Sequence, residues 1–285
     1  MPTNDQSGQL YVVATPIGNL KDITFRAVET LRLMDYVACE DTRHSRPLLQ
    51  HYDIAAELIA LHQHNEVQRA QTLIHHMQAG KDIALITDAG TPLVSDPGAR
   101  LIAQVVAAGI TVVPIPGACA AIAALSVSGL LSDEFVFIDF LPAKGARREQ
   151  ALQSVLLESR TVVLYESVHR MATLLAQLQE QLSLDRQVVV ARELTKRYES
   201  IIRGSIADVV NHFEQNCDTL RGEFVVLIEK NSITEHDSDR HEQTRVLQLL
   251  LQACSAKTAS RLAAEITGGA KNDLYRQAIA MKTKE

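Results

Sequence analysis

The chain has 285 residues, of which 46% are hydrophobic and 22% charged, a balance typical of a folded globular protein. A net charge of −6 argues against a general nucleic-acid binder, and no apolar run approaches the roughly 20 residues that span a bilayer. The polar first ten residues lack a secretion signal, and the four cysteines show no C-x-x-C spacing, so we expect a cytoplasmic protein without a structural zinc site.

Short β-rich segments alternate with helical patterns along most of the chain. Strands are predicted at 10–14, 36–40, 82–87 and 110–115, with helical periodicity at 23–34, 65–78 and 99–109 between them. The alternation resumes with predicted strands at 135–140, 161–166, 187–193 and 223–229. Buried strands separated by helices indicate an α/β fold, here two α/β domains of similar build with a cleft between them.

The predicted organisation has five parts. Residues 1–9 form a flexible tail, 10–117 an N-terminal α/β domain and 118–230 a second α/β domain. The polar segment 231–244 is predicted to be a linker, and 245–285 to be a small domain of two or three helices. Gly268 and Gly269 separate the last two helical patterns, as in a helix-turn-helix. From Ser255 to Glu285 six basic residues oppose three acidic ones, which favours local contact with a polyanion.

Three loops that follow predicted strands are rich in glycine and proline: "ATPIGNL" (14–20), "DAGTPLVSDPG" (88–98) and "PIPGACAAIAAL" (114–125). Open α/β sheets bind ligands at these strand ends, and small residues after Asp88 let a ligand approach the backbone, although an ordinary tight loop is the alternative. Asp96 before Pro97 fits a helix N-cap and is predicted to be structural. The dinucleotide and P-loop fingerprints are missing from the sequence.

Seven motifs occur in a specific order: "TPIGNL", "CEDTRHS", "DAGTP" with "SDPG", "PGACAA", "YESVHR", "ARELTK" and "RGEFVV". With them the chain resembles the ribosomal RNA small subunit methyltransferase I family, ribose 2′-O-methyltransferases of the tetrapyrrole-methylase fold. The resemblance runs from about Leu10 to the "KNDLY" segment at 271–275. It implies S-adenosylmethionine as cofactor, the small ribosomal subunit or its rRNA as partner, and a homodimer.

The same resemblance implies which residues contact the cofactor. The family binds S-adenosylmethionine in the cleft between its two α/β domains. Carried over motif by motif, the expected contacts are Pro16, Ile17, Asp88, Ala89, Gly90, Thr91, Val94, Cys119, Ala120, Tyr165, Leu194 and Gly222. Most are small or apolar, which suits the adenine ring and the methionine stem.

Methyl transfer to a ribose hydroxyl gains from a base that takes the hydroxyl proton. Candidates at strand ends are Glu40, Asp41, Asp88 and Glu166, of which Glu166 and Asp88 rank first. A helix cap is the alternative for Asp41, and an ion pair with Arg43 or Arg170 is the alternative for either glutamate.

Basic side chains near the predicted cleft and in the C-terminal helices are candidate contacts to RNA phosphates. They are Arg43, Lys144, Arg147, Arg170, Lys271 and Arg276. Arg148 fits better as a solvated charge on a helix face. His62 and His64 are interpreted as cleft or core histidines, because no further metal ligands are suggested nearby, and no metal is predicted.

The resemblance thus implies S-adenosylmethionine-dependent 2′-O-methylation of a cytidine in the decoding region of small-subunit (16S) ribosomal RNA. Two alternatives remain open. One is a tetrapyrrole-ring methylase of the same fold, and the other is a non-catalytic RNA-binding factor of ribosome assembly.

Overall fold

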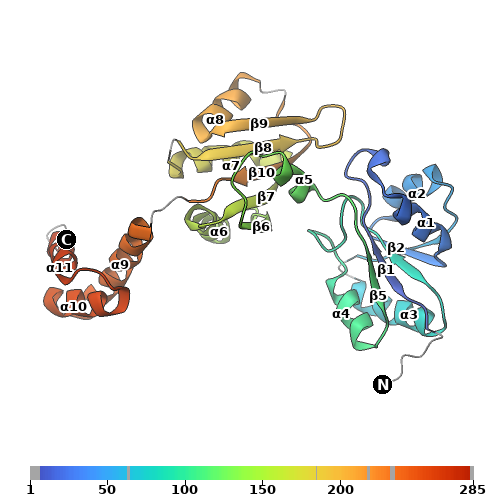
Figure 1. Ribbon diagram of the computed structural model, residues 1–285, viewed down its shortest axis with the longest axis horizontal. Helices are drawn as coiled ribbons and strands as arrows, with labels where there is room; N and C mark the ends of the chain where they lie inside the picture. Colours follow the sequence, from blue (N-terminus) through green and yellow to red (C-terminus); the bar gives the residue numbers. More distant parts are fainter. Residues whose placement is uncertain (1–6, 63–64, 184, 217–218, 232–234, 283–285) are drawn as a thin grey trace. The chain divides into compact units, whose positions relative to one another are not determined.

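A computed structural model describes residues 7–62, 65–183, 185–216, 219–231 and 235–282 (Figure 1). The chain divides into two compact units, Met1–Lys230 and Asn231–Glu285, and both sheets lie in the first unit. None of the described helices is long and apolar enough to cross a membrane.

The first half of the chain builds a parallel sheet in the order β3-β2-β4-β1-β5. Its strands are β1 (Leu10–Val13), β2 (Tyr36–Cys39), β3 (Glu57–Ala60), β4 (Ile83–Leu85) and β5 (Val112–Ile115). Between them lie the short 3-10 helix η1 (Leu20–Asp22) and the helices α1 (Phe25–Leu33), α2 (Thr42–His51), α3 (Glu66–Gln78) and α4 (Ala99–Ala107). One core joins α1 and α2 to the sheet around Leu31, and another joins α3 and α4 around Met77. Burial on both faces explains the continuous apolar runs of these strands.

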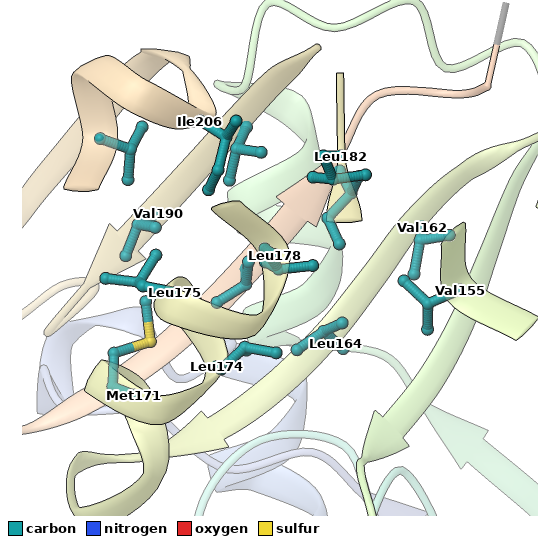
Figure 2. Close-up of a cluster of buried hydrophobic side chains, with 14 of the residues drawn as sticks. Val155, Val162, Leu164, Met171, Leu174, Leu175, Leu178, Leu182, Val190 and Ile206 are labelled. Atoms are coloured by element: carbon teal, nitrogen blue, oxygen red, sulfur yellow. The ribbon is translucent and has the colours of Figure 1, made fainter. Parts of the chain in front are cut away.

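The second half builds a mixed sheet in the order β6-β7-β10-β8-β9, in which only β6 and β7 run parallel. Its strands are β6 (Phe135–Phe140), β7 (Thr161–Ser167), β8 (Gln187–Arg192), β9 (Ser200–Ser205) and β10 (Glu223–Ile228). Helices α6 (Ala146–Leu157), α7 (Val168–Gln181) and α8 (Ile206–Gln215) share one core with the sheet, and α5 (Ala120–Ser126) packs into another. Figure 2 shows the first core, where Leu174 and Leu178 of α7 lie beside Leu164 of β7.

The C-terminal unit is a bundle of α9 (Glu235–Leu251), α10 (Ala256–Thr267) and α11 (Lys271–Lys282). Leu247, Ala259, Ala263 and Leu274 are buried in its core. The Ser255 hydroxyl accepts a hydrogen bond from the Thr258 N–H at 3.3 Å and so caps the start of α10, and Gly268, with φ +71°, caps its end. Gly268 separates α10 from α11 as the sequence predicts.

The structure differs from the sequence prediction at four places. The helix α9 begins at Glu235, inside the predicted linker 231–244. Strands β3 and β9 and helix α2 were absent from the predicted elements. Of the predicted tail 1–9, residues 1–6 lie outside the described residues. At its described end, the Gly8 N–H donates to the Met77 carbonyl at 2.8 Å.

The order of the first sheet brings the chemistry-bearing loops together. Strands β2, β4, β1 and β5 are neighbours and parallel, so their carboxyl ends share one edge of the sheet. The loops that follow β1, β4 and β5 are the three glycine- and proline-rich loops of the sequence.

Candidate functional site

A cavity of about 560 Å³ lies between the loops of the first sheet and the strand ends of the second. This volume is within the roughly 300–1,000 Å³ typical of small-molecule sites. Eleven of the twelve predicted cofactor contacts line it: Ile17, Asp88, Ala89, Gly90, Thr91, Val94, Cys119, Ala120, Tyr165, Leu194 and Gly222. Pro16, the twelfth, is not among the residues that line the cavity, although its neighbour Ile17 is.

The loop after β4 forms the first wall of the cavity. Gly90 and Thr15 exchange two backbone hydrogen bonds, of 2.8 and 3.1 Å, which fasten this loop to the loop after β1. Gly90 has φ +88°, and a Cβ atom there would meet Ile17 Cγ2 at 3.2 Å. Leu93 and Ser95 also have positive φ, near +70°. The sequence uses glycine here because the backbone itself forms the cavity wall.

Tyr165, near the end of β7, belongs to the second wall. Its hydroxyl accepts a hydrogen bond from the Ala121 N–H at the start of α5, at 3.1 Å. Its ring makes edge contacts with Phe137 and Phe140, with centroid distances of 4.9 and 5.7 Å. Burial raises the pKa of the phenol, so Tyr165 is a neutral, fixed part of the wall.

Glu166 follows Tyr165, and its side chain is fully buried. Its carboxylate lies 2.8 Å from the Arg170 Nη2 and 3.4 Å from the Arg148 Nη1, and it accepts a 2.8 Å hydrogen bond from the Ser167 N–H. The oxygens of Glu166 therefore already face three donors. This geometry favours the ion-pair interpretation and gives no support to Glu166 as the base.

Two predicted roles for nearby arginines change with this network. Arg148 was expected to be a solvated charge, but it is only 4% exposed, and it also donates to Gln177 and to the Pro142 carbonyl. Arg170, a predicted RNA contact, donates to the Leu141 carbonyl at 2.9 Å and lies over the Phe140 ring. Both guanidinium groups pair with Glu166, which itself lines the cavity.

Asp88 occupies the opposite wall in a more open setting, with its side chain 32% exposed. One carboxylate oxygen lies 3.0 Å from His44 Nδ1, and the other accepts from the Asp41 N–H at 3.4 Å. Glu40 lines the same wall, and its pKa is raised by burial and then by the negative charge of Asp88. Asp41 caps α2, as the alternative for this residue predicted.

Asp96 is not the predicted helix cap. The helix α4 begins at Ala99 with Gly98 as its N-cap at φ +127°, and Asp96 instead lines the cavity. Burial, followed by the negative charges of Glu40 and Asp88, raises the pKa of Asp96 to about 6. Several acidic groups that face one cavity favour a ligand that carries positive charge.

The remaining predicted RNA contacts lie on the surface. Lys144 and Arg147 are exposed at the start of α6, and Lys271 is exposed at the start of α11. Arg43 is 88% exposed but forms a 2.6 Å ion pair with Asp41. Arg276 pairs with Asp273. Lys144, Arg147 and Lys271 therefore remain as exposed charges suited to phosphate.

Sequence reasoning missed several residues of the wall. Ser95, Asp96, Phe140, Ala191, Phe224 and Val225 line the cavity but were not predicted to contact the cofactor. Phe140 is the last residue of β6 and pairs with Tyr165 of β7, so its place at a strand end was a signal that could have found it. Phe224 and Val225 lie within a buried strand. The sequence of such a strand does not distinguish the side chains that line a cavity from those that pack in the hydrophobic core.

His62 lines a second, neighbouring cavity, whereas His64 lies outside the described residues. Across the described parts of the chain, no group of three His, Cys, Asp or Glu side chains has an arrangement that fits a metal ion.

Comparisons with known families assign both units. Residues 9–210 match the family model of the tetrapyrrole (corrin/porphyrin) methylases, and residues 237–282 match that of the RsmI C-terminal HTH domain. Curated relatives named ribosomal RNA small subunit methyltransferase I are similar over nearly the whole chain. The protein of Pasteurella multocida is 46% identical over 97% of this chain and 98% of its own length, and that of Pseudomonas aeruginosa is 48% identical over 98% and 99%.

Solved structures share the fold of the first unit. Uroporphyrin-III-C-methyltransferase from Thermus thermophilus superimposes with a TM-score of 0.56 at 20% identity, covering 78% of this chain and 94% of its own. Cobalt precorrin-4 methyltransferase gives a TM-score of 0.58 at 19% identity, with the same coverage. At this identity the likeness concerns the fold alone, whereas the full-length relatives define the family. The chain belongs to the tetrapyrrole methylase family and, within it, to the ribosomal RNA small subunit methyltransferase I family of enzymes.

Proposed function

We propose that the protein transfers a methyl group from S-adenosylmethionine to the 2′-hydroxyl of a cytidine in the decoding region of small-subunit (16S) ribosomal RNA. The observation that carries the proposal is the identity of 46–48% over nearly the whole length of relatives that bear the rRNA methyltransferase name. We place the activity in the cytoplasm, where ribosomal subunits assemble.

The described residues fit the cofactor. Apolar and small side chains such as Ile17, Val94 and Ala120 suit the adenine ring and the methionine stem. The acidic wall of Asp88 and Asp96 suits its positive charge. A side chain at Gly90 would project into the wall, as expected where a ligand lies against the backbone. When bound, the cofactor supplies a methyl group activated on a sulfonium.

The C-terminal unit favours RNA over a tetrapyrrole ring as substrate. It matches the RsmI C-terminal HTH domain and exposes Lys271 on α11. Lys144 and Arg147 add exposed positive charge at the start of α6. We assign these three side chains to rRNA phosphates. Homodimerisation remains a prediction, which sedimentation velocity tests.

Calorimetric titration with S-adenosylmethionine tests the cofactor site. We expect Gly90→Leu to abolish binding, since a side chain there meets Ile17. Gly109→Leu is the matched control: Gly109 also has a positive φ, of +74°, but a Cβ there meets nothing within 4 Å. Equal binding by both variants would contradict the assignment of this cavity.

Transfer of labelled methyl to small subunits that lack the modification tests the substrate. Nuclease digestion and mass spectrometry should recover 2′-O-methylcytidine. If the labelled methyl group is transferred to a porphyrin and not to rRNA, the protein is a tetrapyrrole-ring methylase. If the protein binds rRNA but does not bind S-adenosylmethionine, it is a non-catalytic factor of ribosome assembly.

A further inference from the structure

A second cavity, of about 440 Å³, adjoins the first. It is formed by the end of β2, the first turn of α2 and the residues that follow β3. Glu40 and Asp88 line both cavities. A group bound in the second cavity would therefore meet a ligand of the first cavity at these two carboxylates.

The charge of the second cavity indicates what it binds. Three carboxylates line it, those of Glu40, Asp41 and Asp88. Arg43, the one arginine among the described residues of this wall, already makes a two-pronged contact with Asp41, with distances of 2.6 and 3.0 Å. Such a wall repels phosphate and accepts hydrogen bonds from hydroxyl and amino groups. A ribose offers hydroxyl donors, and cytosine offers its exocyclic amine, which carboxylates accept.

His44, in the first turn of α2, is the basic group of this cavity that faces Asp88. Its Nδ1 lies 3.0 Å from the Asp88 carboxylate, which only accepts, so the tautomer that fits this contact donates its Nδ1–H to Asp88 and has its lone pair on Nε2. The side chain is 71% exposed, which leaves Nε2 accessible to a substrate. A histidine oriented by a carboxylate is the arrangement that general bases use in hydrolases.

We propose that the second cavity receives the nucleoside to be methylated, and that His44, positioned by Asp88, takes the proton of its 2′-hydroxyl. The proposal rests on the proposed function. In this step the 2′-oxygen gives its proton to Nε2 and forms a bond to the methyl carbon, while the methyl–sulfur bond breaks and its electron pair stays on sulfur. The products are a 2′-methyl ether, a neutral thioether and an imidazolium at His44.

Single-turnover methyl transfer by His44→Gln tests this role. We expect a rate about 10²–10⁴-fold below that of the natural protein, the range for loss of a general base. The affinity for S-adenosylmethionine, measured by calorimetry, should not change, because His44 does not line the first cavity. The control is His51→Gln, an exposed histidine at the other end of the same helix, which should leave the rate unchanged.

The dependence of the rate on pH distinguishes a base from a phosphate contact. A base acts when neutral, so the rate should rise with pH and then level, and this rise should vanish in His44→Gln. A histidine that binds phosphate acts when charged, so the rate would fall with rising pH. The other titratable and charged side chains that line the same cavity are Glu40, Asp41, Arg43, His62 and Asp88.

The tautomer of His44, read from ¹⁵N chemical shifts, tests the geometry without any activity. We expect the Nδ1–H form in the natural protein and a loss of its dominance in Asp88→Ala. An Nε2–H form in the natural protein, or a His44→Gln variant with a normal rate, would overturn the proposal. If S-adenosylmethionine does not bind the natural protein, the proposed function fails as well, which the calorimetry reports separately.

Discussion

The two walls of the first cavity each carry a carboxylate near the carboxyl end of a strand, Glu166 within β7 and Asp88 just after β4, but they are built differently. On the wall from the second sheet, Glu166 is fully buried between Arg148 and Arg170. On the wall from the first sheet, Asp88 is partly exposed beside His44, and Asp96 lies in a loop of positive-φ residues. We call the wall that carries Glu166 the fixed wall, because ion pairs hold its carboxylate. We call the wall that carries Asp88 and Asp96 the open wall, because its carboxylates are accessible to a ligand.

The difference shows that the role of a carboxylate at a strand end is defined by the side chains that contact it and not by its position in the sheet. A carboxylate whose oxygens are occupied by arginines supports structure, whereas one that orients a histidine, or that is half-buried without a cation, is available for chemistry. The strained backbone at Leu93 and Ser95 lies on the second kind of wall, as is common at functional sites.

The largest effect should come from breaking the fixed wall. Glu166→Ala removes one partner of a buried ion pair and leaves Arg148, itself 4% exposed, without its carboxylate. We expect a loss of about 3–5 kcal/mol in the free energy of unfolding. Asp88→Ala, on the open wall, should cost less than about 1 kcal/mol. Urea unfolding followed by circular dichroism measures both. Similar losses for the two variants would show that the walls do not differ.

This contrast also marks the limit of sequence reasoning. The strands were predictable because β-branched and apolar residues dominate them, and the three loops were predictable because glycine and proline cluster after the strands. The ion pair between Arg148 and Glu166 joins a helix to a strand 18 residues later, which no local pattern reveals. From the sequence alone, Arg148 therefore resembled an exposed residue on the surface of a helix.

Other misses have equally local causes. Strand β9, "SIIRGS", and strand β3, "ELIA", are only partly buried and so lack the long apolar runs of the central strands. Asp96 before Pro97 carries the signature of a helix cap, but the glycine two residues later, at φ +127°, starts the helix instead. The Asp88–His44 contact depends on the order of the strands in the sheet, which brings residues 44 apart together.

A smaller effect should follow from removing one hydrogen bond of the fixed wall. Tyr165→Phe keeps the ring contacts with Phe137 and Phe140 but leaves the buried Ala121 N–H without its acceptor. We expect a loss of about 1–3 kcal/mol in the free energy of unfolding. Tyr198→Phe serves as the control, because Tyr198 is 62% exposed, and it should change stability by less than about 0.5 kcal/mol. If Tyr165→Phe loses no more stability than Tyr198→Phe, the hydrogen bond from the Ala121 N–H to the Tyr165 hydroxyl does not stabilise this wall.

The smallest effect belongs to the open wall and depends on pH. Burial, then the charges of Glu40 and Asp88, raise the pKa of Asp96 to about 6 in the folded chain, above its ordinary value of 3.8. The folded state therefore holds this proton more tightly than the unfolded state, so the stability contributed by the neutral acid is lost as pH rises from about 4 to about 6. Asp96→Asn removes that loss.

The melting temperature of Asp96→Asn, measured against that of the natural protein, should therefore show an advantage that grows from about pH 4 to about pH 6 and then levels. Asp96→Ala separates charge from packing, since its difference from Asp96→Asn should not vary with pH. S-adenosylmethionine should reduce the advantage above pH 6, because its positive charge stabilises the ionised Asp96. If the advantage of Asp96→Asn is the same at every pH, Asp96 does not have a raised pKa in the folded protein. The wall that carries Asp88 and Asp96 would then be no better suited to a positively charged ligand than the wall that carries Glu166.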